Sequence, residues 1–214
     1  MIGSSPETNI DTISRLMHKD DYIICADGGY KFAEMLGVIP DLIVGDFDSS
    51  ERPHNCGSKI ISLPVRKDDT DMFYAVKEGI RRGCDEFILV GATGGRLDHT
   101  YANFCVLKYI ADRKIPARII DSKNEIYVIN SSADGMDTKL GINNLSIQNK
   151  SGYGFGIFPF GCEKCTVSLT GFEYNADKAE MTADFPLGVS NKVINDPAEV
   201  YIHRGCAIII LEAM

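Results

Sequence analysis

Pro-Asp-Leu-Ile-Val-Gly-Asp-Phe-Asp-Ser, residues 40–49, is the segment that decides the fold. Its apolar run at 42–44 does not alternate with polar residues, which predicts a strand buried on both faces. Other apolar runs of this kind lie at residues 22–26, 87–90 and 117–120. Amphipathic or glycine-closed segments predict helices at 30–36, 69–82 and 97–112. Strands that alternate with helices predict right-handed βαβ units and a mostly parallel sheet.

After about residue 121 the pattern changes to short alternating segments separated by Gly, Asn and Asp turns. These segments cover residues 125–129, 144–148, 156–160, 166–169, 199–203 and 207–211. Such a pattern predicts a small antiparallel sandwich or barrel. We therefore expect an N-terminal, mostly parallel α/β domain at 1–121 and a small antiparallel β-sandwich domain at 122–214.

Bulk composition narrows the class of protein. The formal charge of −8 argues against a nucleic-acid partner and is compatible with a cationic ligand, or with a metal that bridges to an anionic one. Acidic proteins are also simply more soluble, which would explain the charge without any ligand. No apolar run approaches the roughly 20 residues of a membrane span, and polar sequence follows the first residues directly. We therefore expect no membrane association and a cytoplasmic protein.

The seven cysteines are scattered, and Cys162 and Cys165 form the only C-x-x-C. A structural zinc site needs a second such pair or a Cys/His set at suitable spacing, and the sequence has neither. A redox pair is expected where a strand leads into a helix, whereas this pair lies in β-type sequence. We expect neither zinc nor redox chemistry there.

Aspartates follow the ends of predicted elements. Asp46 and Asp48 come directly after a strand and point to the same side if the strand geometry continues. At the carboxyl end of a parallel strand they face the crevice where such sheets bind ligands. Two close carboxylates repel unless a cation joins them, and Mg²⁺ suits oxygen ligands. The simpler interpretation is a solvated Asp-rich turn.

Two further segments repeat this placement. Asp27 follows the strand at 22–26, and Asp71 lies in Lys67-Asp68-Asp69-Thr70-Asp71 at the start of a predicted helix. Asp69 or Thr70 is expected to be the cap of that helix. Three aspartate-bearing segment ends would meet at one edge of the sheet.

The segment Gly91-Ala92-Thr93-Gly94-Gly95-Arg96-Leu97-Asp98-His99 joins a buried strand to a helix start. Glycines there let the backbone approach a phosphate, and exposed N–H groups attract anions. The segment is neither a Walker A loop nor a dinucleotide fingerprint. Arg96 suits phosphate by its planar fork, and Lys67 and Arg66 are available as point charges. His99 is expected to be structural.

In the C-terminal part, Ser190 and Asn191 follow Leu187-Gly188-Val189 between two β-segments. Small polar side chains of this kind can hydrogen-bond a heteroaromatic ligand. A turn that uses both residues as local caps is the stronger interpretation on the sequence alone.

Together these motifs resemble one family, the thiamine pyrophosphokinases. The segments that carry the resemblance are 26–29, 40–49, 68–71 and 91–99, with 171–174 and 188–191 similar to that family's vitamin-binding domain. The resemblance implies an α/β nucleotide-binding domain followed by a β-sandwich, and Mg²⁺-dependent conversion of ATP and thiamine to thiamine diphosphate and AMP. It also implies a homodimer whose active sites lie between subunits.

Residue by residue, the resemblance implies that Asp46, Asp48 and Asp71 hold the metal, with Asp27 nearby. Contacts to ATP would come from Lys67, Thr93, Gly94, Gly95 and Arg96. Contacts toward thiamine would come from Asp98, Ser190 and Asn191. Asp71 and Asp98 are the candidates for taking the proton of the alcohol.

One departure concerns the chain start, since family members usually begin with a full apolar strand and only Met1-Ile2 precede Gly3 here. Either the start is trimmed or the first strand is very short, which puts the edge of the sheet in question. The sequence also lacks Trp, so stacking on a pyrimidine would use Phe or Tyr.

Two alternatives remain open. A metal-dependent glycosyltransferase also uses Asp-x-Asp with a nucleotide, but it does not require the glycine segment at 91–96. A sensor that binds thiamine or nucleotide without turnover need not keep three metal-binding aspartates.

Overall fold

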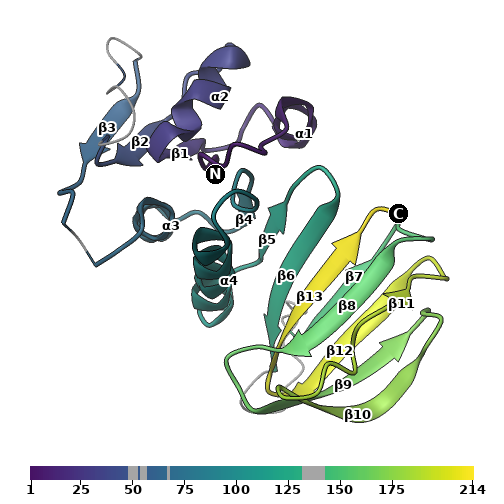
Figure 1. Cartoon of the computed structure of the whole chain (residues 1–214). Helices are drawn as coiled ribbons and strands as arrows, with labels where there is room; N and C mark the ends of the chain where they lie inside the picture. The colour runs from purple at the N-terminus through teal and green to yellow at the C-terminus, as the bar shows by residue number, and fades with distance from the viewer. Residues whose placement is uncertain (48–52, 54–56, 67, 132–142) are drawn as a thin grey trace. The chain divides into compact units, whose positions relative to one another are not determined.

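The computed structural model describes residues 1–47, 53, 57–66, 68–131 and 143–214 (Figure 1). The chain divides into two compact units, residues 1–106 with 119–122 and residues 107–118 with 123–214. No helix in the described residues is long and apolar enough to cross a membrane. The domain boundary at 121 and 122 stays a prediction about which segments fold independently.

The first unit is built on a parallel sheet. Strands β1 (Ile24–Ala26), β2 (Leu42–Gly45) and β3 (Lys59–Ser62) pair in that order, with Cys25 opposite Ile43 and Ile43 opposite Ile60. All residues of β1 and β2 are buried, as the apolar runs predicted. Strand β3 was not predicted, because it is half-exposed and its sequence, Lys-Ile-Ile-Ser, gives no clear period.

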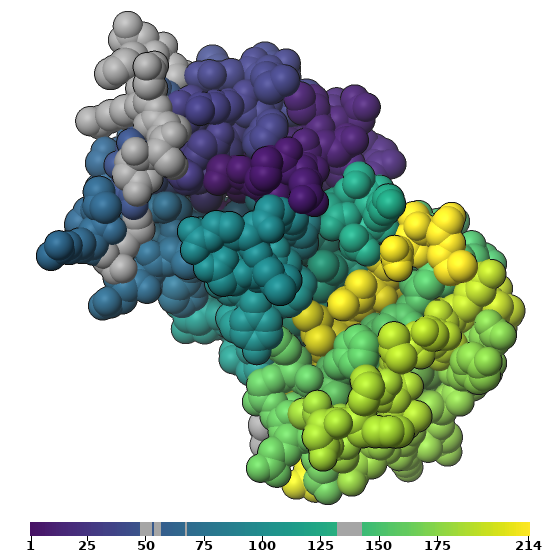
Figure 2. All heavy atoms as spheres, viewed as in Figure 1, coloured from purple at the N-terminus to yellow at the C-terminus, as the bar shows by residue number. Residues whose placement is uncertain are grey.

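The chain start lies inside this sheet. Ile2 forms parallel bridges to Cys25 and to Val90, which follows β4 (Phe87–Leu89), and Ile2 is 3% exposed. In Figure 2 the purple start of the chain is bordered by indigo and teal atoms of the same unit. The chain start, which put the edge of the sheet in question, thus pairs on both sides and does not form that edge. Strand β5 (Ala117–Ile120) pairs beside β4.

Helices pack around this sheet (Figure 1). Their bounds are Ile10–Leu16 for α1, Tyr30–Met35 for α2, Asp71–Arg81 for α3 and Leu97–Ala111 for α4, and Asp27–Gly29 forms the 3-10 turn η1. Helix α1 was missed, since it is only 7 residues long. Its cap is Asn9, whose Oδ1 accepts a hydrogen bond from Thr12 N at 3.0 Å. Thr70 is the cap of α3, because its Oγ1 accepts from Phe73 N at 3.2 Å.

The second unit is an antiparallel β-sandwich, as predicted. One sheet has the order β10-β9-β12-β7, and the facing strands follow the order β11-β8-β13-β6. Their bounds are Asn124–Asn130 (β6), Asn144–Ile147 (β7), Gly154–Pro159 (β8), Lys164–Thr170 (β9), Ala176–Thr182 (β10), Asn191–Lys192 (β11), Ala198–Arg204 (β12) and Cys206–Glu212 (β13). Ile157 and Ile209 from one sheet and Val167 and Ile202 from the other share one buried cluster. Alternation of buried and less buried residues along β9 and β12 supplies part of this core, and β13 is buried along most of its length.

Candidate active site

Three aspartates from separate elements come together in the first unit. Asp27 follows β1, Asp46 follows β2 and Asp71 is the first residue of α3, and all three are half-buried. Each offers a carboxylate oxygen, and these oxygens lie within 4.8 Å of one another. We call this trio the acid cluster. Asp27 was expected only near the metal, and the structure makes it a full member, whereas Asp48 lies outside the described residues.

The backbone around the acid cluster is unusual. Asp27 has φ of 48° and Phe47 has φ of 56°, a left-handed conformation that bulky residues rarely adopt. Phe47 packs against the core that contains Ile43. A Cβ at Gly45 would lie 3.1 Å from the Asp27 Cα, so a glycine is what lets the ends of β1 and β2 approach this closely. Asp27, which follows β1, and Asp46, which follows β2, are thereby brought close together.

Asp71 joins Asp27 and Asp46 from a helix. It occupies the first turn of α3, where exposed N–H groups give a positive partial charge that favours a carboxylate. The capping role at the start of α3 belongs to Thr70 and not to Asp71.

The acid cluster fits a hard divalent cation. Its donor atoms are carboxylate oxygens only, with no thiolate or imidazole among them. Oxygen donors of this kind suit Mg²⁺ rather than Zn²⁺ or copper.

A cavity of about 390 Å³ connects the acid cluster to the glycine segment. Asp27 and Asp71 line it together with Gly91, Gly94 and Arg96. A volume of this size suits a small-molecule ligand. The segment at 3–6 also lines the cavity, and the sequence interpretation missed it. Its signal would have been Gly-Ser-Ser-Pro directly after the first strand.

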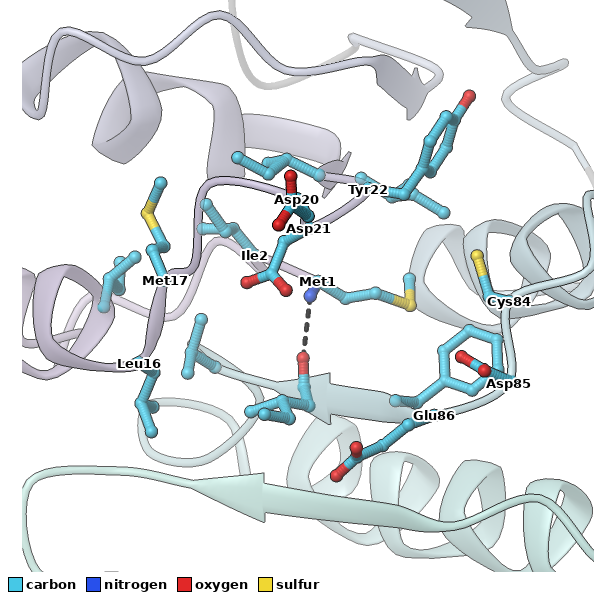
Figure 3. Close-up of a pocket in the computed structure, with 16 residues that line it drawn as sticks. Met1, Ile2, Leu16, Met17, Asp20, Asp21, Tyr22, Cys84, Asp85 and Glu86 are labelled. Carbon is cyan, nitrogen blue, oxygen red and sulfur yellow. Dashed lines mark hydrogen bonds between the residues drawn. The ribbon is translucent and has the colours of Figure 1, made fainter.

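A second cavity, of about 310 Å³, holds none of the predicted site residues (Figure 3). It lies around the start of the chain, where the amino group of Met1 donates to Ile88 O at 2.7 Å. Asp20, Asp21 and Glu86 also line it. Ligands of parallel sheets bind at the carboxyl ends of the strands, so the first cavity is the candidate site.

Left-handed glycines shape the loop beside the acid cluster. Gly91, Gly94 and Gly95 have φ of 64°, 85° and 62°. A buried hydrogen bond holds the loop in place, because Asn103 Nδ2 donates to Ala92 O at 2.7 Å. Thr93 was expected to contact ATP, but its hydroxyl donates to the Asp121 carboxylate at 2.8 Å, and Thr93 does not line the 390 Å³ cavity.

Arg96 and Asp98 form an exposed ion pair. The guanidinium makes two hydrogen bonds to the Asp98 carboxylate, Nε to Oδ1 at 3.1 Å and Nη2 to Oδ2 at 2.6 Å. This pairing lowers the pKa of Asp98 from its usual value and raises the pKa of Arg96. A carboxyl with a lowered pKa is a weaker proton acceptor, which disfavours Asp98 as general base in this arrangement. Lys67 lies outside the described residues.

In the second unit, the side chain of Asn191 binds the backbone of Tyr174. Its Oδ1 accepts from Tyr174 N at 3.0 Å and its Nδ2 donates to Tyr174 O at 2.8 Å. Ser190 is exposed with φ of 61°. The sequence favoured a local turn role for Asn191, whereas the partner of these two bonds lies 17 residues earlier in the chain. Asn191 thereby fixes the segment that carries the exposed ring of Tyr174.

The cysteines form no metal site in the described residues, where the acid cluster is the only group of three or more potential ligands. Cys162 Sγ donates to Cys206 O at 3.3 Å. Burial raises the pKa of Cys165 to about 11 and that of Cys206 to about 12, which makes both thiols unreactive near neutral pH.

Comparisons with known proteins cover both units. Residues 13–119 match the family described as thiamin pyrophosphokinase, catalytic domain, and residues 143–208 match thiamin pyrophosphokinase, vitamin B1 binding domain. A thiamine pyrophosphokinase of Bacillus subtilis is 25% identical over 98% of this chain and 96% of its own length. Thiamine pyrophosphokinase 2 of Oryza sativa is 29% identical over 79% of this chain and 70% of its own length.

Solved structures show the same fold. The crystal structure of the thiamine pyrophosphokinase from Bacillus subtilis superposes with a TM-score of 0.84 at 22% identity, over 99% of this chain and 96% of that one. The thiamin pyrophosphokinase from Candida albicans superposes with a TM-score of 0.79 at 19% identity, over 100% of this chain and 88% of that one.

Proposed function

Because the chain belongs to the thiamin pyrophosphokinase family, we propose that it transfers a pyrophosphoryl group from ATP to the hydroxyl of thiamine, giving thiamine diphosphate and AMP. The observation that carries this proposal is the cavity that two members of the acid cluster, Asp27 and Asp71, line together with Gly91, Gly94 and Arg96 of the glycine loop. A metal-binding group beside a phosphate-binding loop is what transfer of a phosphoryl group requires.

Asp27, Asp46 and Asp71 would hold Mg²⁺, whose chemistry is to neutralise phosphate oxygens as negative charge shifts between them. Asp48 and Lys67 stay predictions, as metal ligand and phosphate contact. The backbone of Gly94 and Gly95 would orient the phosphates, because N–H groups of left-handed turns bind anions. Phosphoryl transfer relies on positioning and charge more than on a strong base, so a weakened Asp98 is compatible with turnover.

Thr93 takes a positioning role in this scheme. Its hydroxyl ties the glycine loop to Asp121, which follows β5, and Asn103 holds the preceding residue. Two buried or half-buried hydrogen bonds fix the loop before ATP arrives. Preorganisation of this kind lowers the entropy lost on binding.

We place thiamine against the second unit, with Ser190 and Asn191 in the binding segment. Exposed apolar side chains gather along the same stretch of sequence: Tyr174, Phe185, Leu187 and Val189. Exposed groups of this kind are typical of ligand or subunit contacts. They also supply the Phe and Tyr rings needed for stacking in a protein without Trp.

A direct test is to mix the protein with ATP, Mg²⁺ and thiamine and to measure AMP and thiamine diphosphate. Release of AMP should require all three components and should fall roughly a thousandfold or more in Asp46→Asn, since a metal ligand is lost. Sugar transfer from a nucleotide-sugar without AMP would instead identify a glycosyltransferase. Binding of thiamine or nucleotide without turnover would identify a sensor.

We further propose a homodimer in which the acid cluster of one subunit works with the Ser190–Asn191 segment of its partner. Asp46→Asn and Asn191→Ala, each inactive alone, are mixed in equal amounts under conditions of subunit exchange. Under two-fold symmetry about a quarter of wild-type activity should return, because half of the dimers are mixed and each contains one intact site. Demonstrated exchange with no recovery would refute shared sites.

A further inference from the structure

Glu7 lies over the turn of the glycine loop. The Gly95 N–H donates to its Oε1 at 3.1 Å. A Cβ built on Gly94 would lie 2.5 Å from Glu7 Oε2 and 2.7 Å from its Cδ. The carboxyl group therefore packs directly against the left-handed turn at Gly94 and Gly95, although Glu7 itself does not line the 390 Å³ cavity.

The segment around Glu7 is held in place. Ser5 N donates to Gly91 O at 3.2 Å, and Thr8 Oγ1 donates to Ser5 O at 2.6 Å. A Cβ on Gly95 would meet Pro6 Cδ at 3.1 Å. The carboxylate thus reaches the loop from a short anchored segment, although Glu7 itself is exposed.

Both anion-binding groups of the loop are occupied by carboxylates in the ligand-free protein. The Gly95 N–H binds Glu7, and the Arg96 guanidinium binds Asp98 through two hydrogen bonds. Backbone N–H groups in left-handed turns and planar guanidinium groups are the usual partners of phosphate oxygens. Each carboxylate oxygen is thus in a position that a phosphate oxygen can take.

We propose that Glu7 is an internal competitor of the ATP polyphosphate, whose carboxylate must leave the Gly95 N–H before a phosphate oxygen binds there. This proposal rests on the proposed function. Apparent affinity falls by the fraction of molecules in which the loop is open, so Glu7 weakens every anionic ligand of the loop. Every ligand that binds the Gly95 N–H loses the same factor in apparent affinity, so Glu7 lowers absolute affinity without changing the preference between such ligands.

The alternative role of Glu7 is to stabilise the loop, and the two roles predict opposite signs. If Glu7 only holds the loop in shape, its removal loosens Gly94 and Gly95 and weakens ATP binding. If it competes, its removal strengthens binding. Glu7→Gln keeps the size of the side chain and removes the charge, and Glu7→Ala removes both. Glu34→Gln, on the exposed face of α2, makes the same change of charge away from the cavity.

The test measures the Kd of Mg²⁺ with α,β-methylene-ATP, whose bridging bond cannot be cleaved, and the Kd of AMP, by titration calorimetry. Glu7→Ala should bind the analogue about three- to tenfold more tightly, because one charge-assisted hydrogen bond no longer competes. Glu7→Gln should show a smaller gain, and Glu34→Gln should match wild type. Where AMP also binds the Gly95 N–H, it should gain the same factor as the analogue. Unchanged or weaker binding of the analogue in Glu7→Ala would overturn the proposal.

A second readout separates this proposal from the proposed function. Inorganic pyrophosphate is titrated while the Gly95 amide resonance is followed by NMR. The resonance should shift at a lower pyrophosphate concentration in Glu7→Ala than in wild type, whether or not the protein turns over ATP. If the Gly95 resonance responds in neither protein, or responds equally in both, the Glu7 proposal fails. If it behaves as expected but no AMP is ever released, only the proposed function fails.

Discussion

Asp27→Asn should make the metal-free protein more stable while abolishing its response to Mg²⁺. Asn keeps the size of the side chain and, like Asp, tolerates the left-handed φ of 48°. Its Oδ1 can still accept from Ser4 Oγ, which is 3.4 Å from the Asp27 carboxylate. The substitution therefore removes a charge with little change of shape.

The magnitude follows from the spacing of the acid cluster. At the 4.8 Å limit that joins the three oxygens, and an effective dielectric constant of about 20, two carboxylates repel by about 3.5 kcal/mol. Asp27 takes part in two of the three pairs. Because all three side chains are half-buried and water screens them further, we expect a net gain of roughly 1–2 kcal/mol in EDTA. For a chain of this length that is a rise in Tm of a few degrees.

The response to Mg²⁺ should have the opposite sign. At a concentration tenfold above its Kd, Mg²⁺ stabilises the wild-type protein by about 1.4 kcal/mol through mass action. The variant should gain little, and its AMP release should fall roughly a thousandfold. The measurements are thermal unfolding in EDTA and in Mg²⁺, together with turnover. Asp85→Asn, an exposed position outside the cluster, is the charge-matched control.

Two outcomes would refute the reasoning. A folded Asp27→Asn protein with near-normal turnover would show that the acid cluster does not hold the catalytic metal. Equal stabilisation of the variant and the wild type by Mg²⁺ would place the bound metal elsewhere.

Three further changes test other parts of the structure. Gly45→Ala puts a Cβ 3.1 Å from the backbone of a neighbouring cluster residue, so turnover should fall at least about tenfold with a stability loss of about 1 kcal/mol, measured by urea unfolding. Replacing Cys162 and Cys165 together by Ser should leave turnover unchanged, and stoichiometric zinc that disappears in this double variant would show otherwise. Arg96→Ala should raise the pKa of Asp98 toward its usual value, measured by NMR titration of the carboxyl carbon. Since the folded-state pKa of Asp98 is lowered, the small stability contributed by the pair is present above the usual pKa and lost as pH falls through the lowered one.

Local signals explain what the sequence could predict. The buried runs that became β1 and β2 are continuous and apolar, and the cap at Thr70 depends on a residue only three positions away. Asp46 and Asp71 were recognisable because each directly follows such a signal. The elements that were not predicted have weak local signals: α1 has only 7 residues, and β3 is half-exposed.

Contacts between distant residues explain what the sequence could not predict. Thr93 was assigned to ATP, but its partner Asp121 is 28 residues away. Asn191 binds a backbone segment 17 residues earlier, and Glu7 reaches Gly95 across 88 residues. No periodicity or spacing rule reports such pairings, because they depend on which strands become neighbours. These pairings determine which partner each residue of a recognised motif contacts.

The very short first strand connects both halves of the candidate site. Ile2 pairs with β1 on one side and with Val90 on the other, so it fixes the separation between Asp27 and the glycine loop. Two glycines make this packing possible: a Cβ on Gly29 would lie 2.1 Å from Ile2 O, and a Cβ on Gly3 would lie 2.4 Å from the carbonyl oxygen of the loop's first glycine. Both distances are below any real carbon–oxygen contact, so either substitution would push the strand away from a neighbour. Because the segment that follows Gly3 also holds the Glu7 carboxylate against the glycine loop, the same few residues line the cavity and contact the loop beside it.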